Sequence, residues 1–473
     1  MPDDQNTYKW KAMVTVAMGA TMATMDNSIT NIAFPTLTET FNSELTTVMW
    51  VTVAYFLVST SSMLVLGKVS DLIGRKRIYS LGMGIFTVGL ITCSLAQSIN
   101  QLIFFRIVQA CGSAMTVSCS AAIITEAFPA EETGRGLGLF GMFVSLGFIL
   151  GPVLGGLLLH WINWQAIFFM RVPIGFIIFF MAITLLKEKE RTTGDIKLDF
   201  PGTFISSAGM FCLVFGVSRI KQFGLKSPFV HLLLGLGLLF FVIFILIERR
   251  TKDPIIDLIL FKNRVFSSAV LSLFLNFLAV PAFILIMPFY LIQGIGMTPS
   301  RAGLLLGVQA TASMIFGPLS GWLSDHFGRA RFTTAGAVAT TIAYCIMLTF
   351  DCQTALSTIV LVLILMGVAY GTFHPPINST IMGGVPRDRL GTASALIATL
   401  RQVGVLVGMA VAGTLFSARK GFYEEELTLK GISSIDAARM AINPAFHDAL
   451  IISIFLSFLV ILFCLYTGRI EKN

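Results

Sequence analysis

The chain reads GKVSDLIGRKRI at Gly67–Ile78 and repeats the pattern as GWLSDHFGRARF at Gly321–Phe332. The shared skeleton is G-x-x-S-D-x-x-G-R-x-R. Each copy stands between two apolar runs that are long enough to cross a bilayer, so each is expected to form a short loop at the same membrane surface. Parallel repeats related by an axis along the membrane normal are a known plan of membrane proteins. The sequence therefore predicts an all-α polytopic membrane protein made of two similar halves.

The composition agrees with a membrane protein. Of the 473 residues, 55% are hydrophobic and 12% are charged, whereas soluble domains are about 25% charged. A soluble enzyme is therefore excluded. Apolar runs of spanning length predict fourteen helices, at roughly 12–34, 46–67, 78–97, 101–126, 136–159, 166–187, 200–219, 229–248, 266–293, 301–323, 332–350, 355–382, 390–417 and 447–468.

The repeat divides these spans into two bundles of six and an extra pair. We expect an N-terminal six-helix bundle over 1–187, a linker with two additional helices over 188–262, and a C-terminal six-helix bundle over 263–473. The charged linker KEKERTTGDIKLD begins at Lys187. The polar segment Ser417–Phe446 is expected to be an outer loop.

The charged residues predict the orientation. The net charge of +8 does not indicate nucleic-acid binding, because the cations fall mostly in short loops between apolar spans. Their bias toward one side places both termini in the cytoplasm. The loop with Arg219, Lys221 and Lys226 is the exception to this bias. Seven cysteines without a CxxC pair and five histidines without an HExxH pattern predict neither a metal site nor a redox pair.

The first span, AMVTVAMGATMATMDNSITNIAFP at Ala12–Pro35, holds the carboxylate of Asp26 well inside. A charge at such a depth costs about 2.5–3.5 kcal/mol on insertion scales and usually marks an ion or substrate path. The sequence therefore predicts that Asp26 binds a proton or a substrate. The alternative is an acid neutralised by a fixed partner for packing. Asp26 lies on a stripe that we expect to line a cavity, with Gly19, Met22, Ala23, Thr30 and Ala33.

Arg106 is the expected partner of Asp26. At about 1.5 Å per helical residue, Asp26 lies about 21 Å from the inner side and Arg106 about 8 Å from the outer side. In a hydrocarbon core about 30 Å thick, the two lie at similar depth. The alternative for Arg106 is a satisfied interhelical hydrogen-bonding group. Met18, Met22 and Thr30 are the expected lining of an adaptable substrate cavity.

Two residues of the second half are further candidates. Arg401 lies about 16 Å into its span, near the midplane, and is expected to help line the cavity. His374 precedes Pro375–Pro376, an expected helix break. His374 either carries a second proton, because histidine titrates near neutrality, or is hydrogen-bonded within the kink.

The two loop copies resemble the signature of the major facilitator superfamily. The matching residues are Gly67, Asp71, Gly74, Arg75 and Arg77 in the first copy, and Gly321, Asp325, Gly328 and Arg329 in the second. Further stretches resemble the fourteen-helix drug:proton antiporters of that superfamily: MDNSITNIAFP, LIFFRIVQACGSA (with Ala110 where glycine is usual) and GFILGPVLGG. The last is similar to the antiporter motif, with Gly147, Gly151, Pro152, Gly155 and Gly156. WINWQAIFFMRVP at Trp161–Pro173 resembles the family's aromatic link into the sixth helix, but has Gln165 and Arg171 where arginine and asparagine are usual.

The resemblance implies a secondary active transporter rather than an enzyme. Its two pseudo-symmetric six-helix bundles would surround a central cavity and rock to exchange protons for lipophilic or cationic compounds, drugs among them. The coupling ion would be H⁺, with no cofactor. The protein would act as a monomer in the cell membrane, and an adaptor protein that spans the envelope is left open.

The resemblance also implies roles for the motifs. Asp71, Arg75 and Arg77 would form a cytoplasmic latch, in which Asp71 caps a helix of the other half near Leu390. Glu126, at the inner end of the fourth span, is the expected partner of Arg75. The glycines of the antiporter motif would let helices approach closely, Pro152 would bend the span, and the contact would seal one side against leak of the coupling ion.

Two alternatives stay open. An exporter of an endogenous amphiphile, such as a lipid, siderophore or peptide, would work by the same mechanism, and protection of cells against toxic cations would separate the two. A transporter-like receptor would bind substrate without turnover in vesicles. A nutrient importer is less favoured by the antiporter motif, and no catalytic cluster at membrane depth points to a membrane enzyme.

Overall fold

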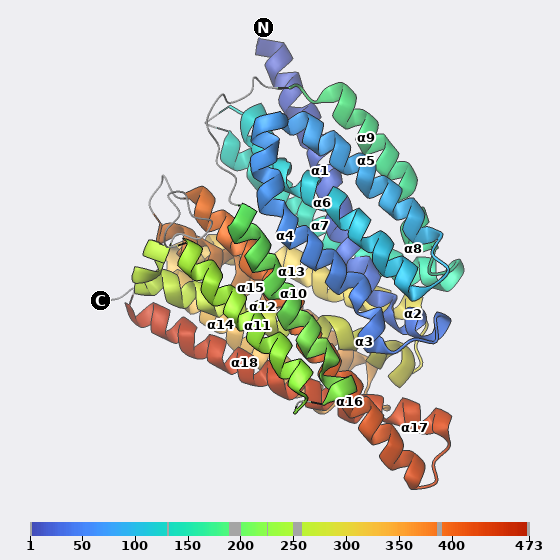
Figure 1. Ribbon diagram of the computed structural model, residues 1–473. Helices are drawn as coiled ribbons and strands as arrows, with labels where there is room; N and C mark the ends of the chain where they lie inside the picture. The colour runs from blue at the N-terminus through green and yellow to red at the C-terminus, as the bar shows by residue number, and fades with distance from the viewer. Residues whose placement is uncertain are drawn as a thin grey trace. The chain divides into compact units, whose positions relative to one another are not determined.

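The structure is a computed structural model that describes residues 2–129, 132–188, 200–224, 226–248, 258–385 and 390–470. Every regular element within these ranges is a helix (Figure 1). The first elements are α1 (Pro2–Ile32), α2 (Phe34–Thr40), α3 (Leu45–Val48), α4 (Trp50–Ile73), α5 (Arg75–Ser94), α6 (Ile99–Ala127), α7 (Thr133–Trp161), α8 (Ala166–Phe169) and α9 (Val172–Leu185). The later ones are α10 (Phe200–Phe223), α11 (Pro228–Glu248), η1 (Leu258–Lys262), α12 (Arg264–Phe289), η2 (Tyr290–Gly294), α13 (Pro299–Phe327), α14 (Arg329–Met347), α15 (Leu356–Gly383), α16 (Leu390–Leu429), α17 (Ser434–Met440) and α18 (Ile442–Ile470).

Each of the fourteen predicted spans coincides with a helix of the structure. Eleven helical stretches among the described residues are long and apolar enough to cross a membrane. The other three predicted spans correspond to α1, α10 and α14, and α10 holds a shorter apolar stretch at Phe204–Ile220. The predicted all-α fold is therefore confirmed, and its least apolar helix of spanning length, α1, carries the intramembrane acid.

The chain forms two compact units, Met1–Ser207 and Ala208–Asn473, here called the first and second units. Their boundary falls within α10. The predicted linker lies mostly outside the described residues, since 189–199 and 249–257 are not among them. The three-part division of the chain stays a prediction.

Helices α1 and α7 of the first unit pack closely along a row of glycines. A Cβ atom added at Gly147 would stand 2.1 Å from Thr24 Oγ1 and 2.4 Å from the Thr21 carbonyl oxygen. One added at Gly151 would stand 1.8 Å from Ser28 Oγ. Small residues four apart allow two backbones to approach in this way. The antiporter-motif stretch therefore holds α7 against the helix that carries Asp26.

Helices α5 and α6 make the second close pair of this unit. A Cβ added at Gly112 of α6 would stand 2.3 Å from the Phe86 nitrogen, and one at Gly82 of α5 would stand 2.5 Å from Met115 Cβ. The reciprocal glycines bring the two backbones together. This contact fixes α6, the helix that carries Arg106, relative to α5.

The second unit packs around α12. Its buried core includes Phe266, Leu273 and Phe277 of α12 and Phe373 and Ile377 of α15. Helix α12 contains two internal prolines and continues into the π-helical turn η2. Loss of a backbone donor at proline accounts for such an irregularity.

The two copies of the loop motif adopt the same local structure. Gly74 and Gly328 have φ angles of +117° and +99°, and each ends one helix and begins the next. These conformations are left-handed and favour glycine. The arginine after each glycine begins a helix and donates to a carbonyl oxygen of the next long helix in the chain. Arg75 Nη1 of α5 donates to a carbonyl of α6 at 3.4 Å, and Arg329 Nη1 of α14 donates to one of α15 at 3.2 Å. The sequence repeat is therefore a structural repeat.

Candidate functional site

The site is built around Asp26, whose side chain is fully buried. Arg106 Nη1 of α6 donates to Asp26 Oδ2 at 2.5 Å, and Arg171 Nη1 donates to Oδ1 at 2.5 Å. Gln109 Nε2 donates to Oδ1 at 3.0 Å and Gln109 Oε1 accepts from Arg106 at 2.8 Å. Both carboxylate oxygens are therefore occupied by donors from other elements. We call Asp26, Arg106, Gln109 and Arg171 the Asp26 cluster.

The two arginines are held in place by the backbone. Arg106 Nε donates to the Val51 carbonyl oxygen at 3.1 Å, and Arg171 Nε donates to the Ile167 carbonyl oxygen at 2.7 Å. Arg171 is the N-cap residue of α9, which begins with Val172 and Pro173. Proline near the first helical position favours a helix start there. The local sequence thus separates α8 from α9, and Arg171 at this junction contacts Asp26 of α1.

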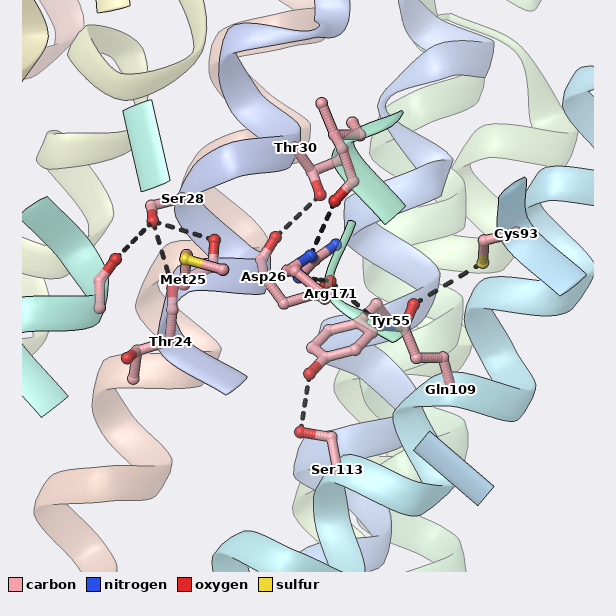
Figure 2. A network of polar contacts seen from close by, with 12 residues as sticks. Thr24, Met25, Asp26, Ser28, Thr30, Tyr55, Cys93, Gln109, Ser113 and Arg171 are labelled. Atoms are coloured by element: carbon pink, nitrogen blue, oxygen red, sulfur yellow. Dashed lines mark hydrogen bonds and ion pairs between the residues drawn. The ribbon is translucent and has the colours of Figure 1, made fainter. Parts of the chain in front are cut away.

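Aromatic rings surround the guanidinium groups. The Arg106 guanidinium carbon lies 4.3 Å from the centroid of the Tyr55 ring, and Phe168 lies beside both arginines, at 5.8 Å and 5.7 Å. The Tyr55 hydroxyl donates to Ser113 Oγ at 2.7 Å. Cation–π contacts of this kind contribute about 0.5–2 kcal/mol each. Figure 2 shows Arg171 beside Asp26, with Tyr55, Gln109, Ser113 and Cys93 on one side and Thr24, Met25 and Ser28 of α1 on the other.

The Asp26 cluster carries more positive than negative charge. Arginine is protonated in proteins at all ordinary pH values. Asp26 is the carboxylate that pairs with Arg106 and Arg171 among the described residues. With Asp26 ionised, the cluster therefore has a net charge of about +1. Arg106 Nη2 and Arg171 Nη2 are buried and have no hydrogen-bond partner among the described residues.

Helix α1 is tied to α7 by hydroxyl groups. Thr24 Oγ1 donates to the Val144 carbonyl oxygen at 3.0 Å, and Ser28 Oγ donates to the Gly147 carbonyl oxygen at 3.3 Å. These bonds cross the same row of glycines that brings the helices together. Thr24 and Ser28, two residues before and after Asp26, thereby attach this face of α1 to α7.

Most of the residues predicted to line a cavity around Asp26 are buried in the structure. Met22 and Thr30 are 2% and 0% exposed, and Thr30 Oγ1 donates to the Asp26 carbonyl oxygen at 2.8 Å. A Cβ added at Gly19 would stand 2.1 Å from Tyr79 Oη of α5. Met18 is half-buried. The cavity role of these residues stays a prediction.

The loop residues are placed as follows. Arg75 Nη1 lies 2.8 Å from Glu126 Oε1, so the expected partner is in contact. Arg77 Nε lies 3.7 Å from Glu188 Oε2. Arg329 Nη2 lies 3.3 Å from Asp325 Oδ1, one turn away in the second copy. The Asp71 side chain and the predicted cap near residue 390 lie outside the described side chains.

The second unit contributes a separate polar group. His374 lies among the rings of Phe277, Tyr370 and Phe373, at centroid distances of 4.8, 3.8 and 5.2 Å. Its Nε2 atom is buried and has no hydrogen-bond partner in the described ranges of the chain. Helix α15 continues through Pro375 and Pro376. Both sequence interpretations of His374 stay predictions. The Arg401 side chain is exposed on α16.

Comparison with known proteins assigns the family. The family model of the Major Facilitator Superfamily matches residues 16–409 and 269–470. The chain belongs to this superfamily. It is therefore a membrane transporter and not an enzyme. No group of three or more His, Cys, Asp or Glu side chains that could hold a metal occurs in the described part of the chain.

Named relatives include transporters with different substrates. The riboflavin transporter RibZ of Clostridioides difficile (strain 630) is 32% identical over 410 residues, which cover 86% of this chain and 88% of that protein. The multidrug resistance protein Stp of Mycobacterium tuberculosis (strain ATCC 25618 / H37Rv) is 30% identical over 416 residues, covering 87% and 77%. The tetracenomycin C resistance and export protein of Streptomyces glaucescens is 26% identical over 413 residues, covering 87% and 77%.

Solved structures agree on the fold. A bacterial homologue of the human lysosomal transporter Spinster, in an inward-facing and unoccupied conformation, matches with a TM-score of 0.71. The match covers 98% of both chains at 16% identity. At this identity the likeness concerns the major facilitator fold alone.

Arg171 and Gln109 are the members of the cluster that sequence reasoning did not assign to the site. The sequence does single out Arg171, because this arginine stands where the resembling family has asparagine. Its partner could not be deduced, since residues 26 and 171 lie on elements whose facing sides depend on tertiary packing. In this superfamily member, the departure from the motif adds a second cation to the intramembrane acid.

Proposed function

We propose that the protein is a secondary active exporter that moves lipophilic compounds, drugs among them, out of the cell in exchange for protons. The observation that carries the proposal is a fully buried carboxylate, Asp26, held by arginines from two other elements. The names of two relatives, which concern drug resistance and antibiotic export, support the direction of transport.

Proton binding at Asp26 would act on the conformation through charge. A proton on either oxygen removes the negative charge that both guanidinium groups face. Neutralising one partner of a buried ion pair costs about 3–5 kcal/mol, because the other charge stays buried. This cost favours a conformation in which the arginines meet water by roughly 100- to 5,000-fold, at 1.4 kcal/mol per tenfold. Proton binding thereby biases the two-state equilibrium that alternating access requires.

The contact between α1 and α7 would keep the proton path closed. The added Cβ distances at Gly147 and Gly151 leave no room for a side chain between the two backbones. A water-filled gap at this contact would let protons pass without substrate. The antiporter-motif glycines thus act by packing rather than by chemistry.

The orientation belongs to the same proposal. Both termini lie in the cytoplasm of a cell that carries the protein in its plasma membrane, and the two motif loops face the cytoplasm. The contact of Arg75 with Glu126 stabilises the first loop, and that of Arg329 with Asp325 stabilises the second.

A second candidate is transport of riboflavin or of another aromatic compound with polar groups. One relative is named as a riboflavin transporter. In the second unit, His374 Nε2 is buried without a partner among three aromatic rings. Stacking rings beside an unsatisfied polar atom suit a planar ligand that forms hydrogen bonds.

Transport into inside-out vesicles tests the proposal. Vesicles from cells with and without the protein receive an imposed pH gradient, acidic inside, and then Nile red, ethidium or riboflavin. We expect accumulation of Nile red only with the protein and the gradient, and its collapse when a protonophore is added. Accumulation that survives the protonophore contradicts proton coupling. Accumulation of riboflavin alone establishes the second candidate instead.

A further inference from the structure

The Asp26 cluster has unused binding capacity on its arginines. Arg106 and Arg171 are 0% and 2% exposed, and each binds a different oxygen of the same carboxylate, so the two guanidinium groups are neighbours. Within the part of the chain that the structure describes, the Nη2 atoms of both have no hydrogen-bond partner. Each Nη2 carries two N–H donors, and a guanidinium offers donors only. The partner that satisfies them must therefore be an acceptor.

The surplus positive charge of the cluster also requires a partner that is a hydrogen-bond acceptor, and one with negative charge. Two guanidinium groups face one carboxylate. The nearest other ionisable groups are Tyr55 and Cys93, which are uncharged in their ordinary forms at neutral pH. Gln109 supplies one carbonyl oxygen, already used by Arg106 Nη1. These described neighbours of the cluster thus provide no second negative charge.

Aromatic contacts do not offset the surplus charge. Tyr55 and Phe168 lie within cation–π distance of the arginines, and such contacts contribute about 0.5–2 kcal/mol each. The desolvation cost of a buried ion is several kcal/mol in real proteins. A bound anion supplies both the charge and the acceptors.

We propose that Arg106 and Arg171 form a binding site for one monovalent anion on their Nη2 atoms. The site rests on the geometry of the cluster, and its use in transport rests on the proposed function. The anion is either a small inorganic ion such as chloride or the acid group of a transported compound. Both present a compact negative charge to the guanidinium groups, which bind oxyanions readily.

The proposal links the anion to the proton. When Asp26 is neutral, the anion no longer competes with a carboxylate for the arginines. Anion affinity is therefore higher when Asp26 binds a proton, and by reciprocity proton affinity is higher when the anion is bound. With chloride, proton entry brings an anion along while the exported compound moves outward.

Direct binding to the purified full-length protein tests the site without transport. We measure binding of ³⁶Cl⁻ and of radiolabelled benzoate at constant ionic strength in gluconate buffer, with benzamide as the uncharged match. We expect saturable binding of at least one anion and none of benzamide. Chloride binding that benzoate does not displace identifies an inorganic anion, whereas displacement identifies a site that also accepts organic acid groups.

Two substitutions are expected to act in opposite directions. Arg171→Asn removes half of the site and should weaken anion binding at least tenfold. Asp26→Asn removes the competing carboxylate and should strengthen it at least tenfold. Arg171→Lys keeps the charge and should fall between wild type and Arg171→Asn. Arg219→Asn, which removes a cation on α10 bonded to Gln222, should bind as wild type does.

Opposite signs cannot result from unfolding, which would abolish binding in both variants. Equal binding of benzoate and benzamide, or unchanged anion binding in both Arg171→Asn and Asp26→Asn, overturns the proposal. Absence of any anion binding in the wild-type protein overturns it as well. Because binding is measured without a gradient, failure of proton-coupled export in vesicles leaves this result standing and concerns the proposed function alone.

Discussion

At the scale of the residue, the positive charge of Arg171 sets the net charge of the Asp26 cluster. Gln165 and Arg171 stand where the resembling family has arginine and asparagine, so a cation appears six positions later in the same link. At residue 171 the guanidinium reaches Asp26 Oδ1. A neutral pair of Asp26 and Arg106 becomes a cluster with surplus positive charge. This exchange, rather than the acid alone, distinguishes the site.

Asp26→Asn is expected to lower thermal stability in detergent, because it leaves two buried guanidinium groups without a counter-ion. The loss in free energy of unfolding should approach about 3–5 kcal/mol, which is typical of breaking a buried ion pair. The double variant Asp26→Asn/Arg171→Asn has the wild-type net charge and should recover part of the loss. Melting temperatures of the purified variants in gluconate buffer measure both effects. Equal melting temperatures for the single and double variants would show that charge balance does not control stability.

Only some contacts of the Asp26 cluster could be predicted from the sequence. The depth of Asp26 and Arg106 follows from helical rise and bilayer thickness, so their contact could be predicted. Arg171 follows a break between two helices, and no periodicity extends across that break. The buried state of Met22 and Thr30 depends on which helices face α1. Such facing relations are set by tertiary packing, which a single sequence does not reveal.

At the scale of the element, the contact of α1 with α7 fixes the helix that carries the acid. Hydroxyl groups of Thr24 and Ser28 reach carbonyl oxygens of α7, and glycines on α7 make room for them. The glycine spacing could be recognised from the sequence as a packing motif. Its partner helix could not, since several spans carry small residues.

Gly147→Ala is expected to disturb this contact. The new Cβ would stand 2.4 Å from the Thr21 carbonyl oxygen, so the backbones must separate. Overpacking of this kind costs about 1–3 kcal/mol. Gly141→Ala on the same helix is the matched control, because a Cβ there meets nothing within 4 Å. Passive proton leak into proteoliposomes, read by a pH-sensitive dye, should rise with Gly147→Ala and not with Gly141→Ala. Equal leak in the two variants would remove the sealing role of the contact.

At the scale of the whole molecule, the repeat in the sequence predicted the duplication, and the apolar runs predicted the fourteen helices. The reason is physical, because bilayer thickness dictates the length of each apolar run. The repeated glycine and arginine adopt matching conformations at Gly74–Arg75 and Gly328–Arg329. Pairing of Arg75 with Glu126 could also be anticipated, since both lie at the same end of their spans.

Cysteine labelling tests the predicted orientation. Cys352 is exposed in the connection between α14 and α15, which the orientation places outside the cell. We expect a membrane-impermeant maleimide to label Cys352 in intact cells, and Cys352→Ser to lose that label. A cysteine introduced by Arg77→Cys in the Cys352→Ser background should react only after permeabilisation. Labelling of both positions from the same side contradicts the topology.

The most direct test of the central claim measures proton release at Asp26. Purified protein in a weakly buffered solution receives a compound that the vesicle screen shows to be transported, and a pH-sensitive dye records protons released on binding. We predict release by the wild-type protein and by Asp26→Glu, which keeps an acid at this position. We predict none by Asp26→Asn, although the compound still binds to it. Undiminished proton release by Asp26→Asn would contradict the assignment of the coupling proton to Asp26.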